Sequence, residues 1–481
     1  MRPLPQLNHP ESFKDLKICV LQPDYTTSKV DYQYYDPKRD LSAIMPEAGI
    51  DHIYLNKLTT YQQLKELKDK NYDIYINLCE GYLEWEVPSI DVIISMDLLG
   101  LPYTGPNANL YDPPKTIMKY LAFCEDVVTP AHILIESLED LHQLPGNLKF
   151  PLFVKPAKAG DSLGVDDASK ANNIEDLLVK VKNIVNEFGS ALVEEYIAGR
   201  EFTVLVCGNA DGKTCTSFVP VEYIFPEGFS FKTYALKTSE LHPTANIPVN
   251  ETALANKLKS IAEQVFMSFN GVGYGRMDFR MNDKGEIFFL EINFTCSVFY
   301  AQGYEGSADY ILLHDGIGQR GFLERIIIEG MSRYRRKEKL FTIKGNAIAG
   351  YGMYAKRDLP KNTLLFKGEE KSQRIVSKKF VDENWDEREK LNFRRYAYPI
   401  SSEVYILWDL QPEEWSPQNH HCDANCTYKG LNLYVNRDIQ KGEELTLDYG
   451  SFLDETMEPF NCHCGSHKCR GLIKGTAQIK G

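Results

Sequence analysis

The spacing of hydrophobic residues changes along the chain, and the first region alternates between two periods. Two short hydrophobic runs, KICVLQP at 17–23 and DIYINLC at 73–79, are typical of buried parallel strands. The stretch between them, TTYQQLKELKDKN at 59–71, has the spacing of an amphipathic helix. This order of strand, helix and strand predicts an α/β unit over roughly residues 1–110.

The pattern from 111 to 330 mixes strands with longer helices, so an α+β domain is expected there. Its predicted strands are FPLFVKP at 150–156, FTVLVCG at 202–208 and EIFFLEIN at 286–293. Its predicted helices are NETALANKLKSIAEQVFMSF at 250–269 and a single long helix at 308–331. The basic stretch at 331–342 is interpreted as a linker, and the glycine-rich, strand-like remainder predicts a mostly-β domain at 343–455 with a tail at 456–481.

Composition limits the classes of function. A chain of 481 residues with 43% hydrophobic and 25% charged residues is typical of a globular protein with more than one core. A formal charge of -13 argues against nucleic acid as a partner. The N-terminus lacks a signal-like apolar run, and VIISMDLLG at 92–100 is too short to span a bilayer, so we expect a cytosolic protein without a membrane partner.

The eleven cysteines fall into two groups. Six stand singly among apolar residues and are expected to be small core side chains: Cys19, Cys79, Cys124, Cys207, Cys215 and Cys296. The other five lie in NHHCDANC at 419–426 and CHCGSHKC at 462–469. Reduced thiols at such spacing predict a structural zinc site, with Cys462, Cys464 and Cys469 as three ligands and either Cys422 or Cys426 as the fourth.

Three separate stretches carry residues suited to a nucleotide. VKPAKAGDSLGV places Lys155 at a strand end and follows it with a loop whose amides would wrap a phosphate, through Gly160, Ser162 and Gly164. VEEYIAGREFTV adds Glu194 and Glu201. Two strands joined by the turn MNDKGE would bring together the oxygen ligands Asp278, Glu291 and Asn293. Oxygen ligands of this kind suit magnesium that bridges nucleotide phosphates.

In this order the stretches resemble the ATP-grasp superfamily, and within it the D-alanine–D-alanine ligases, over residues 16–330. The matching stretches are LGLPYTG, PLFVKPAKAGDSLGV, EEYIAGREFTV and GYGRMDFRMNDKGEIFFLEIN. FKTYALKTSELHPTANIP matches the mobile loop of that family. The resemblance implies ATP and magnesium as cofactors, with Lys115, Lys155 and Lys237 on the phosphates, Glu194 and the backbone at Ile197 on adenine, Glu201 on ribose, Asp278, Glu291 and Asn293 on magnesium, and Arg276 on the tetrahedral oxyanion.

Two stretches depart from that family. Its Gly-rich, Glu-containing motif, which orients the first D-alanine, is replaced here by LQPDYTTSKVDYQYY at 21–35. Its small-residue Pro-Gly stretch, which receives the carboxylate of the second amino acid, is replaced by FTCSVFY at 294–300. We therefore expect an ATP-dependent carboxylate–amine ligase that acts through an acyl phosphate on small amino acids or peptides other than D-alanine pairs.

The C-terminal stretches resemble a SET domain with its post-SET zinc tail over residues 343–475. The match rests on GNAIAGYGMYAKRDLPKNTLLFKGE, NHHCDANC, KGEELTLDYGSF and CHCGSHKCRG. It implies methyl transfer from S-adenosylmethionine to a lysine-containing protein or peptide, and it selects Cys422 over Cys426 as the fourth zinc ligand. The implied site residues are Gly350, Gly352, Asn419 and His420 on the cofactor and Tyr449 in catalysis.

Three interpretations of the whole chain remain at this point. The first is a bifunctional ligase and protein-lysine methyltransferase. The second joins an active ligase to a SET domain that only binds partners, and the third joins an active methyltransferase to a ligase half that serves as a scaffold. The sequence favours the first, because the nucleotide and cofactor positions are all present, and it indicates no oligomeric state.

Overall fold

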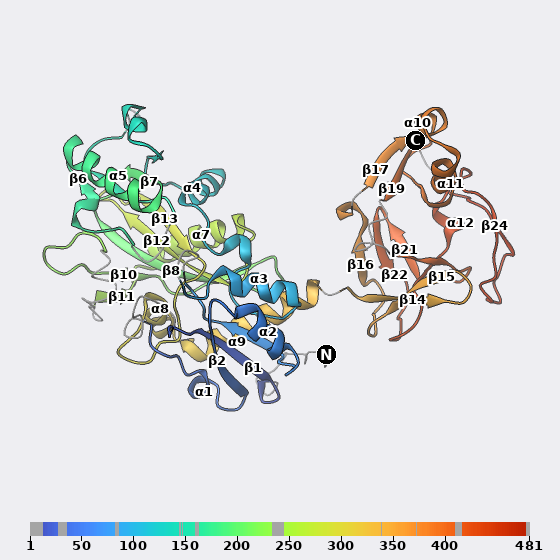
Figure 1. The fold of residues 1–481 in the computed structure, drawn as a ribbon, viewed down its shortest axis with the longest axis horizontal. Coiled ribbons are helices and arrows are strands. Elements are labelled where there is room, and N and C mark those ends of the chain that lie inside the picture. The colour runs from blue at the N-terminus through green and yellow to red at the C-terminus, as the bar shows by residue number, and fades with distance from the viewer. Residues whose placement is uncertain are drawn as a thin grey trace. The chain divides into compact units, whose positions relative to one another are not determined.

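The computed structural model describes residues 13–26, 36–81, 86–143, 146, 148–158, 163–232, 245–337, 339–371, 373–408 and 416–477. The chain divides into two compact units, residues 1–336 and 337–481, and each unit is described by itself. Figure 1 traces both units in chain order.

A three-stranded parallel sheet begins the first unit (Figure 1). β1 (Lys17–Pro23) lies between β2 (Gly49–Leu55) and β3 (Ile74–Asn77). The short helix α1 (Leu41–Ile44) precedes β2, and α2 (Thr60–Lys68) and α3 (Ile90–Leu99) pack together in the core on β1 and β3. The predicted parallel pair is confirmed, whereas β2 was missed because most of its side chains are only half-buried and form no hydrophobic run.

A four-stranded antiparallel sheet follows, in the order β4-β7-β5-β6. Its strands are β4 (His132–Ile135), β5 (Leu152–Pro156), β6 (Lys170–Ala171) and β7 (Ala191–Glu195). α5 (Ile174–Phe188) covers one face, where Leu177, Val181 and Ile184 pack on the buried valines of β5 and β7. The opposite face is therefore left to carry polar side chains.

The largest sheet has six antiparallel strands, and β8 is paired with β9, β10 and β12. Its strands are β8 (Arg200–Gly208), β9 (Cys215–Ser217), β10 (Val221–Tyr223), β11 (Asn246–Pro248), β12 (Tyr274–Met281) and β13 (Ile287–Asn293). Helices α4 (Lys115–Cys124) and α7 (Thr252–Ser268) share a hydrophobic core with it. The strands predicted at 150–156, 202–208 and 286–293 are thus confirmed as β5, β8 and β13.

The stretch predicted as one helix at 308–331 forms two helices instead. α8 (Ser307–Asp315) ends at Gly316, which has a φ of 84°, and α9 (Gly318–Lys337) begins just afterwards. A residue with a side chain rarely adopts this left-handed conformation, so glycine permits the break. α9 continues to Lys337, and the buried Arg333 donates to the carbonyl oxygens of Tyr103 and Gly105, so the stretch expected as a linker begins inside a helix.

The second unit is built mainly from short strands around three small cores, as the sequence predicts (Figure 1). Two sheets have three strands: one is formed by β16 (Leu364–Lys367), β22 (Asn432–Val435) and β21 (Cys426–Lys429), and the other by β17 (Gln373–Ser377), β19 (Val404–Trp408) and β18 (Tyr398–Pro399). β14 (Phe341–Asn346) forms a hairpin with β15 (Gly350–Ala355). Two further pairs are β20 (Asn419–His420) with β23 (Thr446–Leu447), and β24 (Phe460–Asn461) with β25 (Leu472–Ile473). The helices are α10 (Lys378–Asn384), α11 (Glu387–Tyr396) and α12 (Tyr449–Phe452).

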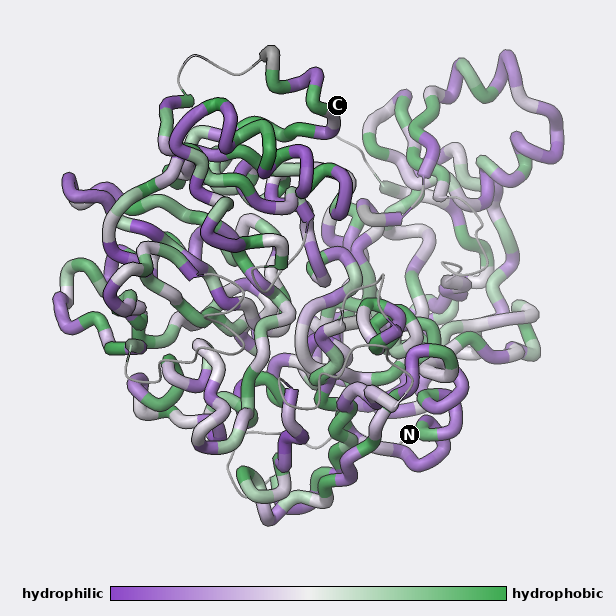
Figure 2. The backbone as a smooth tube through the Cα atoms, turned by 60° about the vertical axis from the view of Figure 1, so that its left-hand side comes forward, coloured by the Kyte–Doolittle hydropathy of each residue, from purple (hydrophilic) through white to green (hydrophobic). Residues whose placement is uncertain are grey.

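Hydrophobic and hydrophilic segments are interspersed along the chain (Figure 2). Among the helices of the described ranges, we find none with the length and apolarity that a membrane crossing requires. Four of the single cysteines are buried as expected, but Cys124 is exposed because it is the last residue of α4. Cys215 is half-buried.

Candidate functional sites

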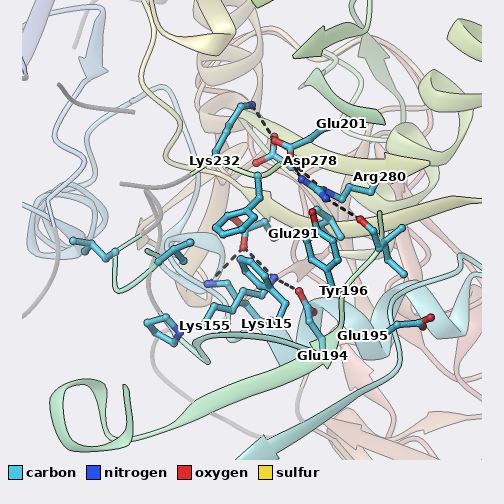
Figure 3. A pocket seen from close by; sticks show the side chains of 17 residues that line it. Lys115, Lys155, Glu194, Glu195, Tyr196, Glu201, Lys232, Asp278, Arg280 and Glu291 are labelled. Carbon is cyan, nitrogen blue, oxygen red and sulfur yellow. Dashed lines mark hydrogen bonds and ion pairs between the residues drawn. The ribbon is translucent and has the colours of Figure 1, made fainter. Parts of the chain in front are cut away.

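A pocket in the first unit lies between the four-stranded and six-stranded sheets, and residues from both sheets line it (Figure 3). Lys155 and Glu194 project from β5 and β7, while Asp278 and Glu291 project from β12 and β13. Segments that are widely separated in the sequence therefore meet at one cleft. This polar face is the one opposite α5.

The hairpin of β12 and β13 gathers the oxygen-bearing side chains. Asp278 is directly opposite Glu291, and Arg276 is directly opposite Asn293. Directly opposed residues, and residues two apart on one strand, share a face of the sheet, so all four lie on the same side. The hydrophobic core takes the other side, through Met277 and Ile292. The hairpin expected from the turn MNDKGE is confirmed.

Lysines face these carboxylates across the pocket (Figure 3). The ammonium of Lys115 lies 3.7 Å from Glu291, and that of Lys155 lies 3.9 Å from Glu291 and 2.7 Å from Glu194. Although burial opposes the charge, Glu194 and Glu291 raise the pKa of Lys155 above its ordinary value. Two fixed cations beside two carboxylates could hold a polyphosphate and its metal ion.

Glu194 is more enclosed than the sequence indicated. Its carboxylate forms ion pairs with Lys155 and with Lys119, at 2.7 Å and 2.8 Å. Burial favours the neutral acid, but the two ammonium groups outweigh it and lower the pKa of Glu194 to about 2. Burial lowers the pKa of Lys119. Sequence reasoning missed Lys119, although it lies four residues after Lys115 and therefore on the same face of α4.

The loop after Lys155 is described only in part. Gly160, Ser162 and Lys237 lie outside the described residues. Gly164 is described, and its carbonyl oxygen accepts a hydrogen bond of 2.8 Å from Lys180, which also pairs with Asp166 at 2.7 Å. These contacts tie the end of the loop to α5.

Arg276 and a further polar cluster in the first unit lie outside the residues that line the pocket. Arg276 lies 3.4 Å from Asp278. The stretch 294–300 contacts residues that lie outside the other departing stretch, 21–35: Tyr300 donates to Asp36 at 2.7 Å, and Ser297 donates to Glu80 at 2.5 Å. The guanidinium of Arg39, which is 1% exposed, pairs with Asp36 at 3.1 Å and with Glu80 at 3.2 Å.

In the second unit, Gly352 and Asn419, two of the residues matched to the methyl donor, lie close together beside Glu444. A Cβ added at Gly352 would lie 2.5 Å from the carboxylate of Glu444 and 3.0 Å from the amide nitrogen of Asn419, so a side chain at this position would force these two groups to move. The Asn419 amide donates to Glu444 at 2.7 Å and to the carbonyl of Tyr351 at 2.9 Å. Gly350 has a φ of 82°, which favours glycine as well.

Tyr449 lies at the edge of an aromatic cluster. Its hydroxyl donates to the carbonyl oxygen of Gln418, and burial raises its pKa. Its backbone amide donates to Nδ1 of His420 at 3.1 Å, so the ring proton of His420 is on Nε2. This Nε2 lies 3.4 Å from the sulfur of Cys422. The neighbouring rings in this cluster are Tyr398, Trp408, Tyr428, Phe452 and Phe460. Sequence reasoning did not identify this cluster.

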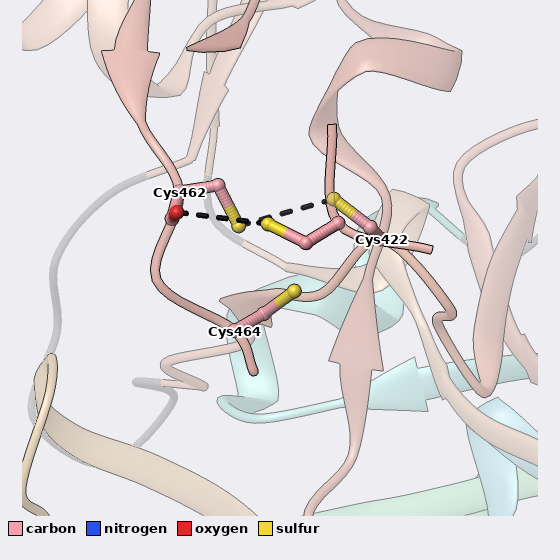
Figure 4. A group of neighbouring side chains, drawn as sticks. Cys422, Cys462 and Cys464 are labelled. Carbon is pink, nitrogen blue, oxygen red and sulfur yellow. Dashed lines mark hydrogen bonds between the residues drawn. The ribbon is translucent and has the colours of Figure 1, made fainter. Parts of the chain in front are cut away.

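Three thiols of the C-terminal tail gather with Cys422, which follows β20, and Figure 4 shows the side chains of Cys422, Cys462 and Cys464 converging. The sulfur atoms of Cys422, Cys462, Cys464 and Cys469 all lie within 4.8 Å of one another. Tetrahedral zinc holds its thiolates about 3.8 Å apart, given Zn–S bonds of about 2.3 Å, and Cys422 and Cys462 are 3.9 Å apart. The donor set therefore fits zinc. Cys426 is buried beside Asn425 instead, and His421 accepts a hydrogen bond from the amide of Asp423.

Comparison with known proteins identifies both units. A family model described as the D-ala D-ala ligase C-terminus matches residues 125–299, and a SET domain model matches residues 350–450. The D-alanine–D-alanine ligase of Legionella pneumophila (strain Lens) is 30% identical over 265 residues, which are 51% of this chain and 70% of that protein. That of Bordetella petrii is 28% identical over 204 residues, 41% of this chain. The chain spans 60% of the length of this Bordetella relative.

Solved structures give a weaker likeness. The D-alanine–D-alanine ligase from Bacillus anthracis complexed with ATP has 19% sequence identity and a TM-score of 0.49, and the match covers 67% of this chain and all of that chain. The VanG D-Ala:D-Ser ligase from Enterococcus faecalis has 17% identity and a TM-score of 0.49, with 66% of this chain covered and 99% of that chain. By its identity to the Legionella protein, the chain belongs to the D-alanine–D-alanine ligase family of ATP-grasp proteins, and it carries a SET domain in its second unit.

Proposed function

We propose that the chain is a bifunctional enzyme. Its first unit would join a carboxylate to an amine with ATP and magnesium, and its second unit would transfer a methyl group from S-adenosylmethionine to a lysine of a protein or peptide. The observation that carries the ligase half is the pocket in which Lys115 and Lys155 face Asp278 and Glu291.

In the ligase reaction the carboxylate substrate takes the γ-phosphoryl group of ATP and becomes an acyl phosphate, with release of ADP. The amine then attacks the acyl carbon, loses a proton, and expels phosphate as the amide forms. Lys115 and Lys155 would neutralise the phosphates, and Arg276 would stabilise the oxyanion of the tetrahedral intermediate. Magnesium, held by Asp278, Glu291 and Asn293, would screen charge on the transferring group.

The substrates are proposed to differ from D-alanine pairs. What supports this is the cluster in which Ser297 and Tyr300, from the departing stretch 294–300, bind Glu80 and Asp36, which also pair with Arg39. Small amino acids or peptides remain the expected class. The test is a screen of amino-acid and peptide pairs for ADP release, in which no pair releasing ADP would contradict a ligase of this class.

The methyltransferase half rests on the position of Tyr449 beside the aromatic cluster and the thiol site. Gly350, Gly352, Asn419 and His420 would hold S-adenosylmethionine, which supplies the methyl group. The apolar rings would favour a deprotonated lysine amine, since burial disfavours its charged form. A binding module without catalysis is the alternative, and it predicts that no lysine accepts a methyl group.

Asn419 and Tyr449 should separate cofactor binding from methyl transfer. We expect Asn419→Ala to weaken S-adenosylmethionine binding by about 1–3 kcal/mol, the free energy of one or two buried hydrogen bonds. Tyr449→Phe keeps the ring, so the affinity should change little while the rate falls about tenfold for each 1.4 kcal/mol of lost transition-state stabilisation. Calorimetry and methyl transfer to lysate proteins measure the two effects. Tyr434→Phe, on β22, is the matched control, and an unchanged rate in Tyr449→Phe would remove Tyr449 from catalysis.

A further inference from the structure

Arg280 lies at one end of the nucleotide pocket and joins four segments of the first unit (Figure 3). Its side chain is 5% exposed. Nε and Nη2 donate to one carboxylate oxygen of Glu201, at 3.2 Å and 2.9 Å. Nη1 donates to the carbonyl oxygen of Ile197 at 2.8 Å, and Nη2 also donates to that of Ser230 at 2.6 Å. Arg280 lies inside the matched stretch at 273–293, but the resemblance assigns roles there to Arg276, Asp278, Glu291 and Asn293 and none to Arg280.

The partner of Arg280, Glu201, is held from both sides. Arg280 is directly opposite Glu201 in the pairing of β12 with β8. Lys232 approaches the other carboxylate oxygen, Oε1, at 3.3 Å. Although burial would favour the neutral acid, Lys232 and Arg280 lower the pKa of Glu201 below its ordinary value. The carboxylate is therefore charged and fixed in orientation at the wall of the pocket.

Acceptor capacity remains on this carboxylate. Each carboxylate oxygen has two lone pairs. Oε2 accepts both hydrogen bonds from Arg280. Among the described residues, the ammonium of Lys232 is the one polar group that contacts Oε1. A hydroxyl group entering the pocket can thus donate to Oε1 without displacing either cation.

We propose that Arg280 is a positioning residue that holds Glu201 so that the pocket distinguishes ribonucleotides from deoxyribonucleotides. This inference rests on the proposed function, in which Glu201 contacts the ribose of ATP. A ribose hydroxyl donates to the Glu201 carboxylate, and a deoxynucleotide leaves that acceptor without a donor. Arg280 is two residues from Asp278 on β12, so one strand carries both the residue that holds Glu201 and a residue of the proposed metal-binding face.

The test measures binding of the full chain by calorimetry, with magnesium and each of ATP, 2′-deoxyATP and 3′-deoxyATP. We expect the wild-type protein to prefer ATP over at least one deoxynucleotide by about tenfold or more, as for a charge-assisted hydrogen bond. In Arg280→Met the preference should fall below about threefold, and Arg280→Lys should restore part of it. Arg200→Met is the matched control, because Arg200 neighbours Glu201 but pairs with Glu222 and Glu251.

A double variant distinguishes a loss of stability from a loss of Glu201 positioning. Arg280→Met leaves a buried carboxylate without its main partner, whereas the double variant Arg280→Met/Glu201→Gln does not. We expect Glu201→Gln and the double variant to show the same reduced preference for ATP as Arg280→Met. The effects of two substitutions that remove the same contact do not add. A preference that survives in Arg280→Met, or is absent from a wild-type protein that binds ATP, overturns the inference. A wild-type protein that binds no ATP overturns the proposed ligase as well.

Discussion

Lys155→Met and Glu291→Ala are each expected to abolish substrate-dependent ADP formation while methyl transfer by the second unit continues. Lys155 is a buried cation between Glu194 and Glu291, and Glu291 belongs to the proposed metal-binding face. Removing one fixed charge from a site that stabilises a transferring phosphoryl group costs a factor of about 10²–10³ in rate. Glu291→Ala should also weaken the magnesium dependence of nucleotide binding.

The matched control is Lys182→Met, an exposed lysine on α5 outside the pocket. It should leave ADP formation unchanged. Both activities are measured on each variant, with ADP release for the first unit and methyl transfer for the second. Normal ATP turnover by Lys155→Met would place the nucleotide site elsewhere, and loss of both activities would indicate unfolding of the chain.

The second large effect concerns the zinc. Metal analysis should give about one zinc per chain, and chelation should abolish methyl transfer while ATP turnover is unaffected. The reason lies in the small core at the C-terminus, where Cys462 and Ile473 pack with Leu453 and with the ring of Tyr449. Without the metal the thiolates have no common partner, so we expect residues 456–477 to lose order and Tyr449 to lose its packing.

Substitutions of one cysteine at a time provide the control for the zinc prediction. Cys464→Ser and Cys469→Ser should lose zinc and methyl transfer together. Cys426→Ala should keep both, because Cys426 lies outside the group of four thiols. Full methylation by a zinc-free preparation would contradict a structural role for the metal.

The grouping of oxygen-bearing side chains on one face of the β12–β13 hairpin could be predicted from the sequence because it depends on local geometry. A turn between two alternating stretches determines which side chains of β12 and β13 share a face, and Asp278, Glu291 and Asn293 follow from that. The same rule would have found Arg280, two residues after Asp278, and helical spacing would have found Lys119. The hairpin and these two residues are thus accessible to sequence reasoning.

Other features depend on contacts that sequence spacing does not determine. Tyr300 and Asp36 are 264 positions apart, and Ser297 and Glu80 are 217 positions apart, yet they pair in one cluster with Arg39. Such contacts depend on how loops pack after the sheets have formed. The break between α8 and α9 was missed for a different reason, since the hydrophobic spacing continues across Gly316 and Gly318.

The central proposal is that one chain carries two working cofactor sites, and calorimetric titration of one preparation tests it most directly. ATP with magnesium, and then S-adenosylmethionine, should each bind with a stoichiometry of one, and Lys155→Met should lose only the first. If wild-type protein bound one ligand and gave no heat with the other over a range of temperatures, the bifunctional account would be contradicted.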